Sequence, residues 1–496
     1  MNTLARLTWT RRGLISLATL AGALFSSSCG SGGNGGTIPL AGNFSRSSLK
    51  GQYIIAQTGT GVTASGTSTA AFSETIIFSA DGAGNVTVAV DDFNQGGQFL
   101  TPTTLPETGT YTMSGDGTGT LTVGGSSYAI TMIDDSHFYV VEQDGGATSS
   151  GYGELQGTTS STPSGTYVFK SHRLSNSSRV GQMNITAGGI AGTEDLLDIG
   201  LTATSVAISS SVSMSAPDTN GRGSFTLSDG TTLNYYVVNA GKFDFMSNAG
   251  SLEIGSSEAQ TGTFSLATLG AGSSYVFGSS GDTGVSGAGG VHSAGVFTSD
   301  AAGNITAGTV DFVQDTTLNP DATVTGGTYT LASSGRGVLN LSLSSGTIGP
   351  QIFWMVNNTR AFFLVNSATG VEDGTYTLQT GGPFSAITAQ AAFTMDGFDS
   401  GGFKDRTGLF SPNGAGTLNW NQVSNSFLPT NPPGFVGTLG TTATYQVSAN
   451  GRVTVVVNNV TTSTPGIVFY LSSPNTGVMV EEDSNVGGAF TQQSSQ

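Results

Sequence analysis

The sequence predicts an all-β protein built from four tandem antiparallel units of about eight strands each. The first observation is a period of two: residues 339–343 read LNLSL, with small polar residues between leucines. Such alternation is typical of an antiparallel sheet with one packed and one solvated face. No stretch beyond the first 29 residues shows sustained helical periodicity. The second observation is a recurring glycine turn, whose four anchors are Gly117, Gly221, Gly335 and Gly451.

Composition excludes several classes of protein. The chain has 496 residues, one of them cysteine, which excludes a disulfide scaffold. Charged residues make up 9%, too few for disorder driven by charge. The net charge of −17 argues against a nucleic-acid partner, because such binders present a basic surface.

Residues 1–29 are typical of a secretory signal. Arg6, Arg11 and Arg12 form a positive start, and residues 13–25 form a short apolar stretch. The only cysteine, Cys29, follows directly after three serines. The segment resembles a bacterial lipoprotein signal, which implies lipidation of Cys29 and a membrane anchor. An ordinary signal peptide cut nearby is the alternative.

The same segment also predicts the export route and the cellular location. Residues 10–15 (TRRGLI) resemble a twin-arginine export signal, with two ordinary signal charges as the alternative. Residues 30–43 are Gly-rich at their start and are expected to form a tether. Processing leaves 12 basic residues (15 minus the three signal arginines) against 32 acidic ones, a net charge of −20. We therefore expect an exported cell-envelope protein, at the outer membrane or cell surface.

Two landmarks in matching order define the repeats. The glycine anchors are 104, 114 and 116 residues apart, and in three copies a tyrosine lies six residues earlier. A second landmark precedes each turn, at residues 78–87, 297–306 and 410–418, and is most diverged in the second copy. The predicted units are residues 44–160, 161–265, 266–380 and 381–496.

The first unit divides into eight predicted strands. They are residues 51–58, 70–80, 86–94, 108–114, 118–124, 127–133, 137–143 and 150–157. Eight sequential antiparallel strands can close into an up-and-down barrel or fold as a two-sheet sandwich. Barrels are favoured, because closure removes exposed edges from strands with few charged residues.

The opening Gly-x-Tyr of two units (Gly51 to Tyr53, Gly165 to Tyr167), together with strand count and length, is similar to calycin-type barrels of lipocalins and avidins. That similarity implies a barrel and, in the family, a ligand cavity. Only Trp354 and Trp420 remain in the processed chain, so the Trp-lined cavity of an avidin is not evident. The whole chain resembles uncharacterised secreted repeat lipoproteins of environmental bacteria, which implies no activity.

No catalytic or metal-binding motif emerges, and we predict neither an enzyme nor a cofactor. The hydrolase string Gly-x-Ser-x-Gly does not occur, and His137, His172 and His292 fall at different places in their units. Residues 81–85 alternate oxygen-bearing side chains like the start of a calcium loop, but lack its later carboxylates, so a hairpin turn is favoured. Adjacent acidic residues point to opposite faces of a strand and cannot act as a facing pair.

Five residues are candidates for binding. Arg222, Arg336 and Arg452 occupy the same turn in three units and could contact a carboxylate or sugar, or could simply be polar hairpin tips. Trp354 and Trp420 could stack on a ligand or pack in the core. In aromatic pairs such as Phe353–Trp354 and Phe469–Tyr470, we expect one ring in the core and the other at an interface or on a sugar.

These features predict a non-enzymatic binding or structural, adhesin-like role. Expected partners are a membrane through the lipid anchor, and a glycan, a surface protein or a small apolar ligand, but no nucleic acid. Small-ligand binding by calycin-like barrel cavities is the alternative. Hollow barrels would favour that alternative, and filled barrels would favour surface recognition. A pocket joining His172 or His292 to a carboxylate and a hydroxyl would favour an enzyme.

Overall fold

A computed structural model describes residues 43–496, apart from 64–68, 101–104, 174–176, 188, 211–213, 228–229, 284–289, 315–316, 368–369, 400–401, 428–434, 459–460, 462–465 and 495–496. Within this part of the chain, two short 3-10 helices accompany 33 strands, which confirms the all-β prediction. Among the same residues, no helix has the length and apolar character that a membrane crossing requires.

Unit 1 is an eight-stranded antiparallel ring with one additional short strand. Its strands are β1 (Lys50–Val62), β2 (Thr69–Asp81), β3 (Asn85–Gln95), β4 (Gln98–Leu100), β5 (Glu107–Met113), β6 (Thr118–Val123), β7 (Ser126–Asp134), β8 (His137–Glu142) and β9 (Ala147–Leu155). Each strand pairs with its neighbour, and β9 returns to β1. In the described part of the unit, β4 pairs with β3 alone. All eight strands predicted for this unit are present, and only β4 was missed.

Units 3 and 4 are closed barrels. Unit 3 consists of β18 (Ser274–Asp282), β19 (Gly290–Ser299), β20 (Asn304–Gln314), β21 (Thr317–Leu331), β22 (Arg336–Leu343), β23 (Gly346–Asn357), β24 (Arg360–Val365) and β25 (Val371–Leu378). Unit 4 consists of β26 (Ala391–Asp399), β27 (Gly402–Pro412), β28 (Thr417–Phe427), β29 (Phe435–Val447), β30 (Arg452–Val457), β31 (Ile467–Ser473), β32 (Thr476–Glu481) and β33 (Asn485–Gln492). The preference for barrels over sandwiches is confirmed.

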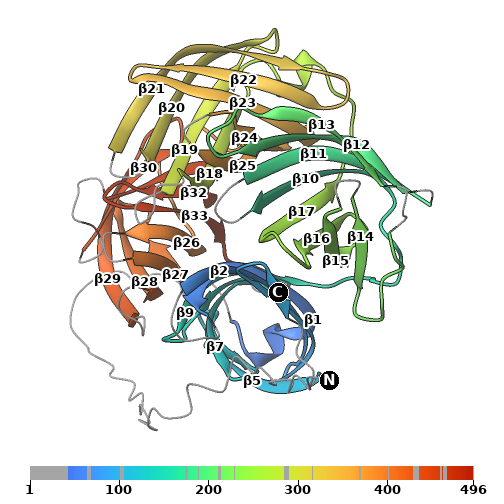
Figure 1. Ribbon diagram of the computed structural model, residues 1–496. Coiled ribbons are helices and arrows are strands. Elements are labelled where there is room, and N and C mark those ends of the chain that lie inside the picture. The colour runs from blue at the N-terminus through green and yellow to red at the C-terminus, as the bar shows by residue number, and fades with distance from the viewer. Residues whose placement is uncertain are drawn as a thin grey trace, which may run out of the picture.

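Unit 2 has eight strands in the same order, but its sheet does not close within the described residues. The strands are β10 (Gly165–Arg173), β11 (Ser177–Thr186), β12 (Gly189–Asp198), β13 (Thr204–Ser210), β14 (Arg222–Thr226), β15 (Thr232–Asn239), β16 (Lys242–Ser247) and β17 (Glu253–Ala259). The order runs from β13 at one edge to β14 at the other. Figure 1 shows this unit in green, beside the ring-like unit 1 in blue.

The anchor turn and a cap close three of the barrels at one end. Phe44, Phe264 and Phe384 precede the first strands of units 1, 3 and 4 and join their cores, the first two beside η1 (Arg46–Ser48) and η2 (Leu266–Leu269). The tyrosines six residues before the anchors, Tyr111, Tyr329 and Tyr445, donate hydrogen bonds from their hydroxyls to cap carbonyls. Gly335 shows why the anchor is glycine: its φ is 92°, and a Cβ there would lie 3.1 Å from Phe264.

The turn at residues 81–85 also belongs to this cap. Asp81 accepts hydrogen bonds from the side chain and backbone of Asn85 and from the backbone of Ala83, which lowers the pKa of Asp81 to about 2. Asp300 and Asn413 form the same turn in units 3 and 4. The backbone N–H of each cap tyrosine then donates to a glycine carbonyl of this turn. These contacts support the hairpin interpretation, since the carboxylate oxygens are bonded within their own loop.

The four units form a closed ring in which unit 4 lies against unit 1 (Figure 1). A glutamine after the last strand of each unit fastens that unit to the next. Its side-chain amide donates to two carbonyls there, one of them just before the anchor glycine. The glutamines are Gln156, Gln260, Gln379 and Gln493. Because Gln493 binds Asp116 and Met132, the chain end returns to unit 1 and closes the ring. We call these contacts the glutamine latches.

Apolar residues fill both the barrels and the contacts between them. Inward-facing Tyr275 and Phe277 lie in the core of unit 3, whereas the intervening Val276 packs outward against unit 4. Similar outward clusters join units 1 and 2, units 2 and 3, and units 4 and 1. Burial of both faces explains unbroken apolar runs such as residues 352–356.

Candidate functional site

The lipidation candidate Cys29, the signal segment and most of the tether lie outside the described residues. The first described residue is Asn43, one residue before the Phe44 cap of unit 1. Lipidation and the cell-envelope address therefore stay predictions.

The three repeated arginines lie at the contacts between units. Each guanidinium forms two hydrogen bonds with a buried aspartate of the preceding unit. The pairs are Arg222–Asp92 (2.6 and 3.2 Å), Arg336–Asp195 (2.9 and 2.6 Å) and Arg452–Asp311 (2.7 and 2.6 Å). The carboxylate that each arginine contacts thus belongs to the chain itself. Binding of an outside carboxylate or sugar stays a prediction.

An aromatic residue completes each pair. Tyr236, Trp354 and Tyr470 stand opposite the arginines on the neighbouring strand and donate to the same aspartates. Burial alone would raise the pKa of Asp311, but hydrogen bonds and charge from Arg452 lower it below its ordinary value. We call the Asp–Arg–aromatic set the clamp. It holds units 1 and 2, 2 and 3, and 3 and 4 together.

At the contact between units 4 and 1, uncharged residues occupy all three clamp positions. Thr118 follows the anchor where the other units have arginine, and Thr131 stands opposite it. Val423 stands in place of the aspartate, because it pairs with Thr407, three residues before Phe410, just as Asp311 pairs with Ala294, three residues before Phe297. Thr131 instead accepts a hydrogen bond from Thr407 of unit 4 (2.9 Å). The arginine is therefore absent from unit 1 together with its acidic partner.

The two tryptophans are enclosed by the chain. Trp354 is 3% exposed, packs between units 2 and 3, and donates from its indole nitrogen to Asp195 (2.8 Å). Trp420 is fully buried in the core of unit 4, where it donates to Gln422 (2.9 Å). The outward members of the aromatic pairs, Tyr236, Phe362 and Tyr470, also lie at contacts between units. Stacking of these rings on an outside ligand stays a prediction.

A pocket that joins His172 to a carboxylate and a hydroxyl would favour an enzyme, and the surroundings of His172 meet this condition only in part. Its Nδ1 lies 3.0 Å from both the Ser178 hydroxyl and the Asp373 carboxylate, and Ser178 donates to Asp373 at 2.9 Å. A serine nucleophile needs its base at one ring nitrogen and the orienting carboxylate at the other. Here the serine and the carboxylate share one nitrogen, and Lys170 also contacts Asp373. The cluster joins β10 and β11 of unit 2 to β25 of unit 3.

The remaining histidines have structural surroundings. His292 is buried where unit 3 meets Gly397 and Gly487 of unit 4, and burial lowers its pKa to about 4. His137 lies beside Asp134 at a hairpin (2.9 Å). Within the described part of the chain, no group of three or more His, Cys, Asp or Glu residues is arranged to hold a metal ion.

A polar layer crosses each barrel interior at the end opposite the cap. Gln57, Glu74 and Ser149 form it in unit 1, Ser171, Arg179 and Glu253 in unit 2, Ser279, Ser293 and Glu372 in unit 3, and Arg406 and Glu481 in unit 4. In unit 2 the layer also contains Glu194, whose carboxylate lies 3.5 Å from Arg179. The charged groups of these layers are buried, and each has a partner: the Gln57 amide for Glu74, and a hydroxyl or an opposite charge for the others.

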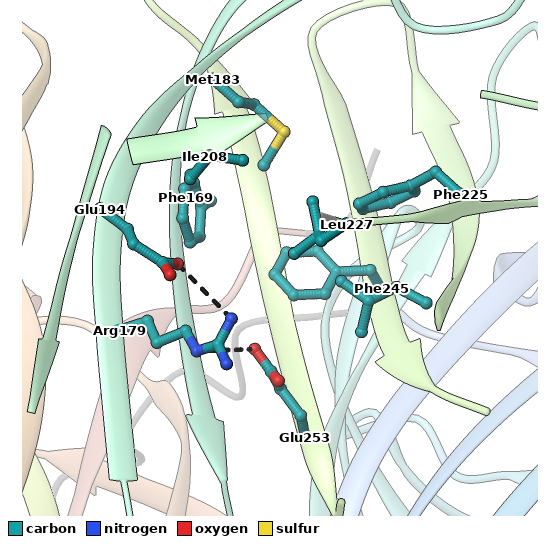
Figure 2. A pocket seen from close by; sticks show the side chains of 10 residues that line it. Phe169, Arg179, Met183, Glu194, Ile208, Phe225, Leu227, Phe245 and Glu253 are labelled. Carbon is teal, nitrogen blue, oxygen red and sulfur yellow. Dashed lines mark hydrogen bonds and ion pairs between the residues drawn. The ribbon is translucent and has the colours of Figure 1, made fainter. Parts of the chain in front are cut away.

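A pocket lies at the polar layer of unit 2 (Figure 2). Its lining residues are Phe169, Arg179, Met183, Glu194, Ile208, Phe225, Leu227, Leu233, Phe245 and Glu253. Figure 2 shows Arg179 between Glu194 and Glu253 on one side, with Phe225 and Leu227 on the other. The pocket encloses about 290 Å³, part of it open to solvent, and its enclosed part has room for about one water molecule.

Unit 2 differs from the other units at the cap. Ser215 stands six residues before the anchor, where units 1, 3 and 4 have the cap tyrosine. The β11–β12 hairpin pairs Thr186 with Gly189, and the sequence between them has no aspartate or asparagine like Asp81. The pocket lies between Ile208 of β13 and Phe225 of β14, the two strands at the edges of the open sheet.

Sequence reasoning missed the clamp aspartates, the glutamine latches and this pocket. The latches carried a signal, because a glutamine recurs near the end of each predicted unit, at Gln156, Gln260, Gln379 and Gln493. The aspartates carried no comparable signal, because another acidic residue stands directly beside two of them, Asp91 beside Asp92 and Glu194 beside Asp195. The pocket carried none beyond the divergence of the second copy.

Comparison with known proteins adds little. No protein-family model matches the chain, and no curated protein matches it. Among solved structures, the chain is similar to intact Ap-TbpB, with its N and C lobes, at 8% sequence identity and a TM-score of 0.20. The match covers 66% of this chain and 76% of that one. A TM-score this low supports no argument about fold or function.

Proposed function

We propose that the protein is an exported, lipid-anchored component of the cell envelope with a non-enzymatic binding role. The anchor is Cys29, and the tether that follows carries a ring of four β-barrels at the outer membrane or cell surface. The binding role is performed by the ring and not by the anchor. A purely structural, adhesin-like use of the ring is the outcome if binding is not found.

One observation carries the binding role: unit 2 departs from the other units of its own chain. Aromatic and aliphatic side chains pack the interiors of units 1, 3 and 4, and a cap closes each at one end. Within the described residues, unit 2 alone has an open strand order, and its pocket lies at the opening. In a repeat protein, the copy that differs is the one in which a site is expected.

The same observation favours recognition of another molecule's surface over storage of a small ligand. The enclosed part of the unit 2 pocket holds about one water molecule, whereas a drug-sized ligand needs about 300 Å³ or more of enclosed space. The packed interiors of the other barrels are the arrangement that favours recognition at the surface. A small apolar ligand remains an outcome of the binding test.

The anchor is tested by Cys29→Ser in the full chain. Without a thiol the residue cannot be lipidated, and one lipid-bearing cysteine is the only membrane anchor the sequence predicts. We expect the variant to move from the membrane fraction to the soluble fraction, while Ser28→Ala, a neighbouring control, stays with the membrane. A Cys29→Ser protein that remains membrane-bound would overturn the anchor.

The binding role is tested with the chain from Gly36 onward, screened against a glycan array, fatty acids and extended peptides. We expect saturable binding of at least one class, reduced by substitutions at the mouth of unit 2. Uniformly negative results would overturn the binding role and leave a structural one.

A further inference from the structure

We propose that the contact between units 3 and 4 is a proton-operated switch, which is tight while the side chain of Glu482 carries a proton and loosens when that proton is lost. The inference goes beyond the binding role proposed above and does not depend on it. The switch consists of Glu482, which follows β32, and of the clamp beside it, formed by Asp311, Arg452 and Tyr470.

Glu482 is the exception at a position that recurs in all four units. In every unit, the residue after the next-to-last strand donates its backbone N–H to a carbonyl in or beside the strand before it. These residues are Gln143, Asn248, Asn366 and Glu482. Three of them are neutral amides, and unit 4 alone has an acid. An amide and a protonated carboxyl can both donate a hydrogen bond without carrying charge, so a proton lets Glu482 replace an amide.

The clamp provides a partner for one carboxylate but not for two. Arg452 forms two hydrogen bonds with Asp311, and Tyr470 donates to the same carboxylate. Glu482 is only 4% exposed, and its Oε1 lies 3.6 Å from an Nη atom of Arg452 and has no hydrogen-bond partner among the described residues. The Glu482 carboxyl also shares a hydrogen bond with Asp311, which two ionised carboxylates could not form.

The surroundings of Glu482 keep this proton in place. The titratable or charged groups that face it come from four strands: Asp311 of β20, Asp321 of β21, Arg452 of β30 and Tyr470 of β31. Burial, the hydrogen bond with Asp311 and the charge of Asp311 raise the pKa of Glu482 to about 8, and Arg452 opposes this only in part. Asp321 is 68% exposed, so water screens its charge. The adjacent Glu481 points into the barrel toward Arg406.

Loss of the proton favours the loosened contact. In the tight contact the second negative charge would be buried beside Asp311, whereas water solvates it once the contact loosens. An exposed glutamate titrates near pH 4.3, so loosening releases one proton between about pH 4.3 and pH 8. The equilibrium constant for loosening should therefore rise by up to about tenfold per pH unit and become constant above pH 8.

His292 sets the lower limit of the range in which the switch operates. It is buried in the same contact, where burial lowers its pKa to about 4. Loosening lets this histidine bind a proton below its ordinary pKa of about 6.5, which has the opposite pH dependence to the release from Glu482. The two effects cancel at lower pH, so the switch operates between about pH 6.5 and pH 8.

Hydrogen exchange between pH 6.5 and pH 9 tests the switch. The reporters are the backbone N–H groups of Asp321 and Thr380, which donate to Asp311 (2.7 Å) and to Ser472 of unit 4 (2.8 Å). Each rate is divided by the intrinsic rate of an unfolded chain at the same pH. We expect the loosening constant of the parent to rise about tenfold or more between pH 6.5 and pH 8. Glu482→Gln keeps a donor toward Asp311 and should change less than twofold.

Asp321→Asn is the matched control. It removes an acid that also faces Arg452 (3.7 Å) but lies in water, and asparagine accepts the positive φ of 52° at this position. This variant should show the same rise as the parent. An equal rise in Glu482→Gln, no rise in the parent, or loss of the rise in Asp321→Asn would overturn the assignment to Glu482.

Selective 13C labelling of the glutamate carboxyls follows the proton in the parent protein, without any substitution. We expect a glutamate resonance that titrates near pH 8 and is absent from Glu482→Gln. If no glutamate of the parent titrates above pH 7, the proposal is overturned, even where Glu482→Gln does not fold.

Discussion

At the scale of single residues, the few charged side chains at contacts between units occur together with the residues that they bind. The clamp at the contact of units 2 and 3 places Asp195, 1% exposed at its side chain, under Arg336 and Trp354. The fourth contact has Thr118, Thr131 and Val423 in the same positions. A buried carboxylate that loses its arginine remains charged and poorly solvated, so the members must be lost together.

A double-mutant cycle tests this coupling. Arg336→Thr should reduce the free energy of unfolding by about 2 kcal/mol, since it leaves Asp195 buried, although partial exposure of the arginine reduces the cost. Asp195→Ser should cost less, because the arginine can turn toward water. The double variant should recover most of the loss. Urea unfolding of all four proteins measures the cycle, and simple addition of the two single effects would contradict the clamp.

At the scale of elements, most strands next to another unit are buried on both faces. β27 is one such strand: Arg406 points into unit 4, while Asp405 points toward β9 of unit 1 and accepts a hydrogen bond from Thr148 (2.5 Å). Burial, together with the charge of Asp396, raises the pKa of Asp405 to about 8. The folded protein therefore keeps a proton on Asp405 that the unfolded chain releases near pH 4.

This strand contact predicts a pH dependence. The folded pKa is raised, so the contribution of Asp405 to stability is full below about pH 4 and declines as the pH rises toward 8. Asp405→Asn removes the titration and should be increasingly more stable than the parent between pH 4 and pH 9. Thermal melts across this range measure the difference. Asp81→Asn is the control: the pKa of Asp81 is about 2, so this substitution should show no such trend. A difference independent of pH would contradict the assignment.

At the scale of the whole molecule, one of the four contacts closes the ring without a connecting segment. Gln493 binds carbonyls 377 and 361 residues away, and Asn425 donates to the carbonyls of Glu142 and Ala147 of unit 1. The other three contacts have a covalent linker and a clamp. We therefore expect the ring to open most readily at the contact between units 4 and 1.

Paired substitutions test the closure. Gln493→Ala with Asn425→Ala removes the described side-chain donors of these two residues at the closing contact. Gln156→Ala with Asn94→Ala removes the matching donors between units 1 and 2, where a linker and a clamp remain. Small-angle scattering should show a larger maximum dimension for the first pair only. An unchanged dimension in the first pair, or an equal increase in both, would contradict the closing role.

The fold was predictable from the sequence because its signals are local. Alternation with period two, as at residues 339–343, sets which side chains enter a barrel, and tight glycine turns set the order of the strands. All eight principal strands of unit 1 followed from these rules. The candidate site was less predictable: Arg222, Arg336 and Arg452 were identified by their repetition, but their aspartate partners lie 130 to 141 residues away.

By itself, the sequence determined the number of units, the strand class and the barrel as the way to bury one face of each strand. Only the tertiary structure decided that the barrels form a ring, that clamps and latches join them, and that the sheet of unit 2 does not close among the residues described. The physical reason is the separation along the sequence between the residues that contact each other. Hairpins are stabilised between neighbouring strands, whereas contacts between units depend on outward faces that meet only after each barrel has formed. The chain has few charged residues, and several of them form buried pairs between units.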